Sequence, residues 1–91
     1  MSEPLADAFL TPHALSEMKR RNIDIGTVVG ILNAPEQRSR VRAGRDVLQG
    51  RIIADGKTYL VRVFVDIDRD PPAVVTVYRT SKVDKYWSPG S

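Results

Sequence analysis

The chain has 91 residues, of which 42% are hydrophobic and 27% are charged, and its formal net charge is +3 at pH 7. This length leaves room for one hydrophobic core, and the absence of cysteine excludes disulfides and thiolate chemistry. No apolar run reaches the roughly 18 residues of a membrane span, and the first residues lack the pattern of a signal peptide. We therefore expect one small cytoplasmic domain with no membrane partner.

Residues 1–10 show no sustained periodicity, and we expect them to form a flexible N-terminal arm. The single domain, residues 11–87, should begin with the typical helix start Thr11-Pro12, in which Thr is the N-cap and Pro takes the first helical position. This first helix should extend to about Arg21. Its apolar stripe is narrow and consists of Ala14, Leu15 and Met18.

A second helix is expected after a short break. Asn22 can adopt the left-handed conformation that ends a helix, and Asp24 can cap the next one. Apolar residues then recur at helical spacing between positions 28 and 32, and Pro35 follows the end of this pattern.

The remaining chain changes to the two-residue period of strands, which are expected at residues 37–43, 47–54, 57–65 and 73–80. Asp55-Gly56 is typical of a two-residue type I′ turn, and residues 68–72 should form the next turn. The expected fold is α+β, with two N-terminal helices on one face of a four-stranded antiparallel meander sheet. The other face would be open to solvent or a ligand, and residues 88–91 would be a frayed tail.

His13 is the only histidine, and it falls in the first turn of the first expected helix. A neutral imidazole there can act as a base in acid–base catalysis. From its position alone, a polar residue that merely follows a helix cap explains His13 more simply.

Arginines are concentrated in the first expected strand. Arg38, Arg40 and Arg42 share one face, at a spacing of about 6.6 Å per step that resembles the phosphate spacing of an extended nucleic-acid strand. We therefore expect this row to contact RNA. The alternative is that an edge strand carries charge to avoid pairing with other chains.

The end of the last expected strand, from Thr76 to Lys82, combines hydroxyls, a phenol and cations. Metal-independent RNA cleavage needs a base for the ribose 2′-hydroxyl, cations for the charge on the phosphorane, and an acid for the leaving oxygen. Arg79 can bind phosphate through two nitrogens, Lys82 supplies a point charge, and Tyr78 can carry a proton. Ordinary β-propensity is the better explanation for Thr76. One histidine and no cysteine predict no metal site.

Two lysines, Lys82 and Lys85, precede the aromatic pair Tyr86 and Trp87 near the C-terminus. These rings could stack on RNA bases, or they could cover the hydrophobic face of the sheet. Lys85 and Trp87 are therefore candidate RNA contacts.

Two groups of residues, taken together, resemble a known family: Thr11-Pro12-His13-Ala14 with Met18, Arg21 and Ile23, and Val75–Lys82 with Lys85-Tyr86-Trp87. From about residue 9 to residue 87 the chain is similar to the domain-of-unknown-function 4258 family of small bacterial proteins. That family is grouped with the barnase, colicin and RelE-like ribonuclease fold, many members of which are toxins of toxin–antitoxin pairs. The resemblance implies helices followed by a four-stranded antiparallel sheet.

Carried over by position, the resemblance marks six residues of this chain: His13, Arg21, Thr76, Tyr78, Arg79 and Lys82. The family often has Arg at the position of Glu17 and Gly at that of Asn22. Glu17 could pair with His13 or with Arg21, since each lies one helical turn away.

We therefore expect a toxin-like, metal-independent endoribonuclease that cleaves mRNA or ribosome-associated RNA by 2′-hydroxyl attack and uses no cofactor. The catalytic set would be His13, Tyr78, Arg79 and Lys82, and a cognate antitoxin would silence the toxin. The alternative is a catalytically inactive module of the same fold that binds RNA or a partner protein. An exposed sheet edge alone would also suit a plain protein-interaction domain.

Overall fold

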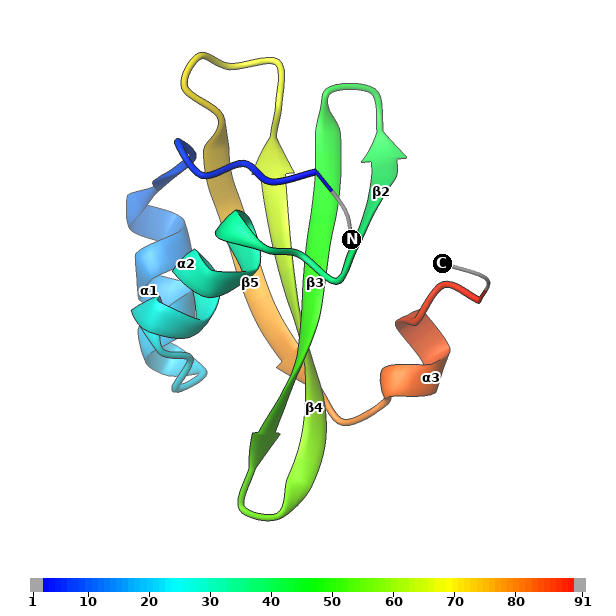
Figure 1. The fold of residues 1–91 in the computed structure, drawn as a ribbon. Helices are drawn as coiled ribbons and strands as arrows, with labels where there is room; N and C mark the ends of the chain where they lie inside the picture. Colours follow the sequence, from blue (N-terminus) through cyan, green and yellow to red (C-terminus); the bar gives the residue numbers. More distant parts are fainter. Residues whose placement is uncertain (1–2, 90–91) are drawn as a thin grey trace.

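The computed structural model describes residues 3–89 and shows an α+β fold (Figure 1). Its strands are β1 (Phe9–Leu10), β2 (Gln37–Arg42), β3 (Arg45–Ala54), β4 (Lys57–Asp66) and β5 (Ala73–Thr80). Its helices are α1 (Pro12–Arg20), α2 (Ile25–Asn33) and α3 (Val83–Tyr86). The ends of the expected arm and tail, residues 1–2 and 90–91, lie outside the described residues.

The five strands form one mixed sheet in the order β1-β5-β4-β3-β2. Strands β2 to β5 make the expected antiparallel meander, but β1 pairs with β5 in parallel, with Phe9 opposite Ala73. The expectation of a four-stranded, purely antiparallel sheet is therefore wrong. Strand β1 could not be predicted because two residues are too few to show an alternating pattern. It is defined by pairing with a distant strand, including a hydrogen bond from the Phe9 N–H to the Pro72 carbonyl oxygen at 2.9 Å.

Helices α1 and α2 begin and end close to the expected positions, but the side chain of Asp24 makes no capping hydrogen bond to α2, contrary to expectation. The Thr11 side chain caps α1 by accepting the N–H of Ala14 at 3.2 Å, and Pro12 occupies the first helical position. Asn22, with φ at 55°, adopts the left-handed conformation that separates the two helices. Both helices lie on the same side of the sheet (Figure 1), as expected.

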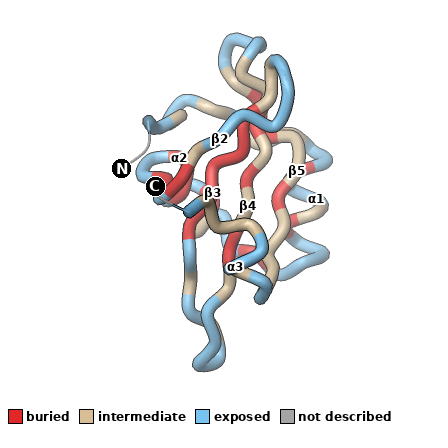
Figure 2. The backbone as a smooth tube through the Cα atoms, turned by 90° about the vertical axis from the view of Figure 1, so that its right-hand side faces the viewer, coloured by how far each residue is buried: buried red, intermediate tan, exposed pale blue. Residues whose placement is uncertain are grey.

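The core lies between these two helices and one face of the sheet, which we call the helix face. Met18 and Val28 come from the helices, and Leu48, Val63 and Val77 lie side by side on β3, β4 and β5; all are at most 2% exposed. Figure 2 shows this burial along the three central strands. Burying each such side chain contributes roughly 1.5–3 kcal/mol, so this layer fixes the strands that carry the polar residues described below.

The β3–β4 hairpin turns at Asp55-Gly56, as the sequence predicts. These residues have φ values of 53° and 73°, which a type I′ turn requires, and Ala54 pairs with Lys57. The hairpin extends beyond the two helices (Figure 1), and its tip is exposed (Figure 2).

A third helix, which was not expected, lies on the opposite side of the sheet from α1 and α2 (Figure 1). We call this side the second face. Two buried glutamines hold the segment: Gln49 Nε2 donates to the Tyr86 carbonyl oxygen at 3.0 Å, and Gln37 Nε2 donates to that of Ser88 at 2.8 Å. The second face is therefore partly covered.

Between residues 3 and 89, no helix combines the length and the apolar character that crossing a lipid bilayer would require.

Candidate nucleic-acid interface

Arg62 lies in the middle of the second face, between Gln49 of β3 and Tyr78 of β5. Its half-buried guanidinium donates from Nε to Gln49 Oε1 at 3.0 Å and from Nη1 to Tyr78 Oη at 2.8 Å. Its Nη2 makes no hydrogen bond to any residue that the structure describes. Arg62 is therefore held in one orientation while N–H donors remain free for a ligand.

Three aromatic rings surround this guanidinium. The Arg62 Cζ lies 5.3 Å from the ring centre of Phe64, 5.8 Å from that of Tyr78 and 4.5 Å from that of Tyr86. Phe64 and Tyr78 stack with centroids 5.9 Å apart, and Tyr86 meets Tyr78 edge-on at 6.3 Å. All three rings are half-buried. We call Gln49, Arg62, Phe64, Tyr78 and Tyr86 the Arg62 cluster.

A buried hydrogen-bond network connects the cluster to strand β2 and to the C-terminal segment. Gln49, which is 2% exposed, donates from Nε2 to Gln37 Oε1 at 2.8 Å as well as to the Tyr86 carbonyl. The same Gln37 oxygen accepts the backbone N–H of Ser88 at 3.0 Å. A buried polar network whose members all have partners is rigid, so the Arg62 guanidinium is positioned before any ligand arrives.

No carboxylate between residues 3 and 89 forms an ion pair with Arg62. The ion pairs found between residues 3 and 89 engage Glu17, Glu36, Asp46 and Asp66, and none of them includes Arg62. Glu17 and Asp46 each pair with two other arginines, and Glu36 and Asp66 each pair with one. Arg62 thus presents a positive charge to whatever binds the second face.

Two further cations border the cluster. The Arg21 Cζ lies 6.0 Å from the Tyr78 ring centre, and the Lys85 Nζ lies 5.3 Å from that of Tyr86. Cations beside aromatic faces suit a ligand that carries both negative charge and flat rings.

Glu17 takes the second of the two pairings considered from the sequence. Its carboxylate accepts from Arg20 Nη2 at 2.6 Å and from Arg21 Nη2 at 3.4 Å, and His13 is not its partner. The hydrogen bonds from Arg20 hold the pKa of Glu17 below its usual value. Two neighbouring arginines therefore neutralise the negative charge of Glu17.

Several residues predicted from the sequence lie in or beside the cluster. Tyr78 is a member, Thr76 lies on the same face opposite Phe64, and Arg21 and Lys85 border it. Lys82 is exposed just beyond β5, where its backbone N–H donates to Thr80 Oγ1 at 3.0 Å.

Two members of the expected catalytic set lie elsewhere. Arg79 alternates with Tyr78 along β5, so its side chain is on the helix face, with its Cζ 4.8 Å from the Tyr59 ring centre. His13 is exposed in the first turn of α1, roughly 12 Å along the helix axis from Arg21. The structure therefore does not bring His13, Tyr78 and Arg79 together.

The arginine row on β2 is largely neutralised. Arg38 Nε and Arg40 Nε both donate to the carboxylate of Asp46, at 2.8 and 2.9 Å. An irregularity in the pairing between Arg40 and Arg42 breaks the even spacing of the row. The expected ladder of free cations is therefore reduced to Arg42, whose Nη1 donates to the Ala43 carbonyl at 3.3 Å.

Trp87 packs on an arginine at the side of α3. The Arg51 Cζ lies 4.1 Å from its ring centre, and Arg51 also donates to the carboxylate of Glu36 at 2.7 Å. Trp87 thus has a partner within the chain.

Arg62 and Gln49 were not among the residues predicted from the sequence, although they lie at the centre of the Arg62 cluster. One signal was available: Arg62 interrupts an otherwise apolar run from Leu60 to Val65, and such a charge needs a polar surrounding. That Gln49 and Tyr78 lie beside Arg62 could not be predicted from the sequence because their positions depend on the register of three strands.

The part of the chain from residue 3 to residue 89 contains no group of three or more His, Cys, Asp or Glu side chains that could hold a metal ion.

Fold and site together define a small α+β domain with a cationic, aromatic cluster on one face of its sheet. The model of a family described as a domain of unknown function, DUF4258, matches residues 10–79, and the chain belongs to this family. The matched region includes every member of the Arg62 cluster except Tyr86. No curated protein and no solved structure matches the chain.

Proposed function

We propose that this chain binds single-stranded RNA through the Arg62 cluster. The observation that carries the proposal is the guanidinium of Arg62, which has no carboxylate partner among residues 3–89 and is held by Gln49 and Tyr78 beside three aromatic rings. The free Nη2 can donate to a phosphate oxygen, and a hydrogen bond of this charged kind is stronger than a neutral one.

The aromatic rings favour unpaired bases over a duplex. Bases of a single strand can splay out and stack on exposed ring faces, at about 1–3 kcal/mol per base, whereas bases inside a helix cannot. Tyr78 and Tyr86 are half-buried and border the guanidinium, so a base stacked on either would leave its phosphate near Arg62.

A second candidate function is metal-independent cleavage of the bound RNA, and a separate observation favours it. Tyr78 Oη lies 2.8 Å from Arg62 Nη1, so a group that can carry a proton stands next to the group that would bind the phosphate. In this proposal the ribose 2′-oxygen bonds to phosphorus and gives its proton to water, the bond from phosphorus to the 5′-oxygen breaks, and the Tyr78 phenol donates its proton to that leaving oxygen. Arg62 and Arg21 stabilise the charge on the phosphorane. A toxin of a toxin–antitoxin pair would act in this way, and an antitoxin covering the cluster would silence it.

Binding of a single-stranded RNA of about 12 nucleotides tests the first function, with Arg62→Gln compared with Arg40→Gln. Both variants lose one positive charge, but Arg40 is already paired with Asp46. At about 0.15 M salt, Arg62→Gln should weaken binding tenfold or more, because it loses a charged hydrogen bond to phosphate. Arg40→Gln should change binding by less than threefold. Equal losses in the two variants would contradict a site at Arg62.

The same mixtures, analysed for cyclic phosphate ends, test cleavage. Wild type should produce such ends, and Tyr78→Phe should retain binding and lose the product because the ring remains but the hydroxyl does not. Intact RNA in every lane would exclude the second function and leave the first. Circular dichroism of each variant shows whether a loss comes from unfolding.

A further inference from the structure

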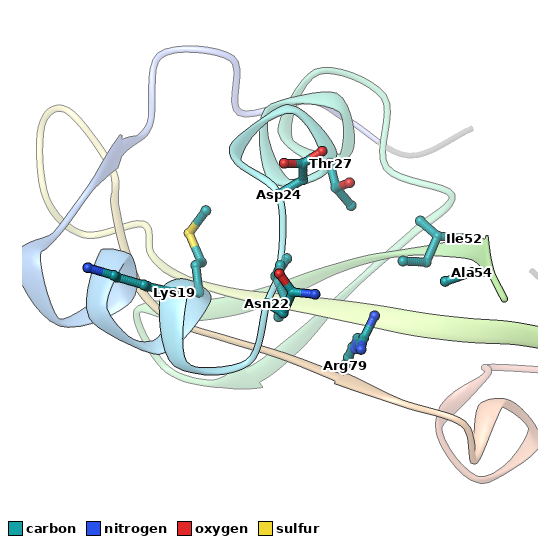
Figure 3. A pocket seen from close by; sticks show the side chains of 9 residues that line it. Lys19, Asn22, Asp24, Thr27, Ile52, Ala54 and Arg79 are labelled. Carbon is teal, nitrogen blue, oxygen red and sulfur yellow. The ribbon is translucent and has the colours of Figure 1, made fainter.

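A cavity of about 460 Å³ opens on the helix face, on the other side of the sheet from the Arg62 cluster. It lies between the α1–α2 connection and the β3–β4 hairpin, and Figure 3 shows the side chains that line it. It forms because the hairpin extends past the helices and leaves half-buried Ile52 and Ala54 without a covering element. Its volume falls in the range of about 300–1,000 Å³ that is usual for small-ligand sites.

Two cations, Lys19 and Arg79, contribute to the lining, and Figure 3 shows that their side chains point in different directions. Lys19 comes from α1 and Arg79 from β5, and neither takes part in an ion pair within residues 3–89. The neighbouring residues Arg20 and Arg21 are both paired with Glu17. Stacking of Arg79 beside Tyr59 holds its guanidinium in place without neutralising it.

An amide, a carboxylate and a hydroxyl also line the cavity. The side chains of Asn22, Asp24 and Thr27 make no hydrogen bond to any other residue that the structure describes. Asp24 precedes α2 but does not cap it with its carboxylate. Figure 3 shows Asp24 and Thr27 on one side of the cavity, apart from Arg79. Acceptors and donors are therefore available at a distance from the cations.

The apolar part of the lining includes Met18, Ile23 and Ile52. A ligand that uses the whole lining carries an anionic group, hydroxyl or amino donors, and a flat apolar ring. A simple anion would leave the apolar wall unused, and an acidic peptide would meet the carboxylate of Asp24. A ribonucleotide has all three features.

We propose that this cavity binds one ribonucleotide. Arg79 binds the phosphate, Asp24 accepts from ribose hydroxyls or a base amino group, and the base packs on half-buried Ile52. The nucleotide is either free or the terminal unit of an RNA chain, because both present the same groups. The proposal does not depend on RNA binding at Arg62, since the two sites lie on opposite faces of the sheet.

The test is a ¹⁵N NMR titration of the full chain with AMP and with UMP, compared with adenosine and with inorganic phosphate. A nucleotide should shift the amide signals of residues 19–27 and 52–54 in a saturable way. Adenosine and phosphate alone should each bind at least tenfold more weakly, because each lacks part of the ligand. Absence of saturable shifts in these residues, or phosphate binding as tightly as AMP, would overturn the proposal.

Variants separate this site from a general cationic surface. Arg79→Gln and Asp24→Asn should each weaken AMP binding at least fivefold, and the control Arg40→Gln, at an arginine already paired with Asp46, should leave AMP binding unchanged. The spectra themselves show whether each variant is folded. Equal affinity in Arg79→Gln and wild type would refute the site, as would shifts seen only with an acidic peptide.

A short RNA with and without a 5′-phosphate distinguishes the two sources of the nucleotide. Saturable shifts in residues 19–27 with the phosphorylated RNA assign the site to an RNA end. Shifts with AMP but with neither RNA assign it to a free nucleotide. Both results support a nucleotide site in the cavity. Neither result depends on whether RNA binds at Arg62, which is tested separately.

Discussion

Arg45 and Asp66 lie opposite each other on β3 and β4, and Arg45 Nε donates to Asp66 Oδ1 at 2.7 Å. This hydrogen bond is the main reason that the pKa of Asp66 lies below its usual value. A carboxylate with a lowered folded-state pKa stabilises the fold above its unfolded pKa of about 3.9, and this contribution is lost as the pH falls through the folded value.

We therefore expect Asp66→Asn to lower the free energy of unfolding by about 0.5–1 kcal/mol at about pH 7, because the pair is partly exposed. The difference from wild type should shrink below about pH 4 and vanish near pH 2, where both proteins lack the charge. Urea unfolding at these pH values measures it. Asp70→Asn is the control, because Asp70 lies in the adjoining turn and forms no ion pair with any residue from 3 to 89. A difference that stays constant with pH would contradict the assignment.

At this scale, sequence reasoning succeeded where the chemistry is local. The cap at Thr11, the left-handed Asn22 and the Asp55-Gly56 turn depend on one to four consecutive residues, and the structure confirms each. The period of a strand also separates Tyr78 from Arg79, although the expected catalytic set placed both in one site. Local alternation was sufficient to show that the two side chains point to opposite faces.

The α3 segment is the element on which the shape of the second face depends. It is attached by backbone atoms of Tyr86 and Ser88 that bond to the side chains of Gln49 and Gln37. Apart from a small contact with β4, it lies away from the helix-face core. The core should therefore survive its removal, while the two glutamines would lose partners.

A chain that ends at Ser81 should remain folded but lose about 1–3 kcal/mol of stability, since buried amide groups are left with fewer hydrogen bonds. Thermal unfolding followed by circular dichroism measures this loss. Ser88→Ala is the matched control, because its backbone N–H and carbonyl make the bonds to Gln37 and remain in place. An unchanged unfolding temperature in the shortened chain would show that the network does not stabilise the fold.

The elements missed from the sequence are the shortest ones. β1 has two residues and α3 has four, so neither shows a period. Both are defined by bonds to distant parts of the chain: Phe9 to Pro72, and Gln37 to Ser88. The four long strands and two long helices were predictable because each contains several repeats of its own period.

Over the whole molecule, the sheet separates two groups of polar residues. The Arg62 cluster lies on the second face, and Arg79 with Lys19 lines the cavity on the helix face (Figures 1 and 3). The sequence indicated cations and aromatics near the end of β5, and alternation divides them between the two faces, but the side chains of β3 and β4 that lie beside them depend on the register of the three strands. That register includes an irregularity between Phe64 and Val65, which no local pattern reveals.

A ¹⁵N NMR titration of the full chain with single-stranded RNA of about 12 nucleotides shows directly whether RNA binds at Arg62. RNA should shift the Arg62 Nε–H signal and the amide signals around Tyr78 and Tyr86, and raising the salt concentration should reverse these shifts. Shifts confined to the β2 arginines, with Arg62 unaffected, would contradict this binding.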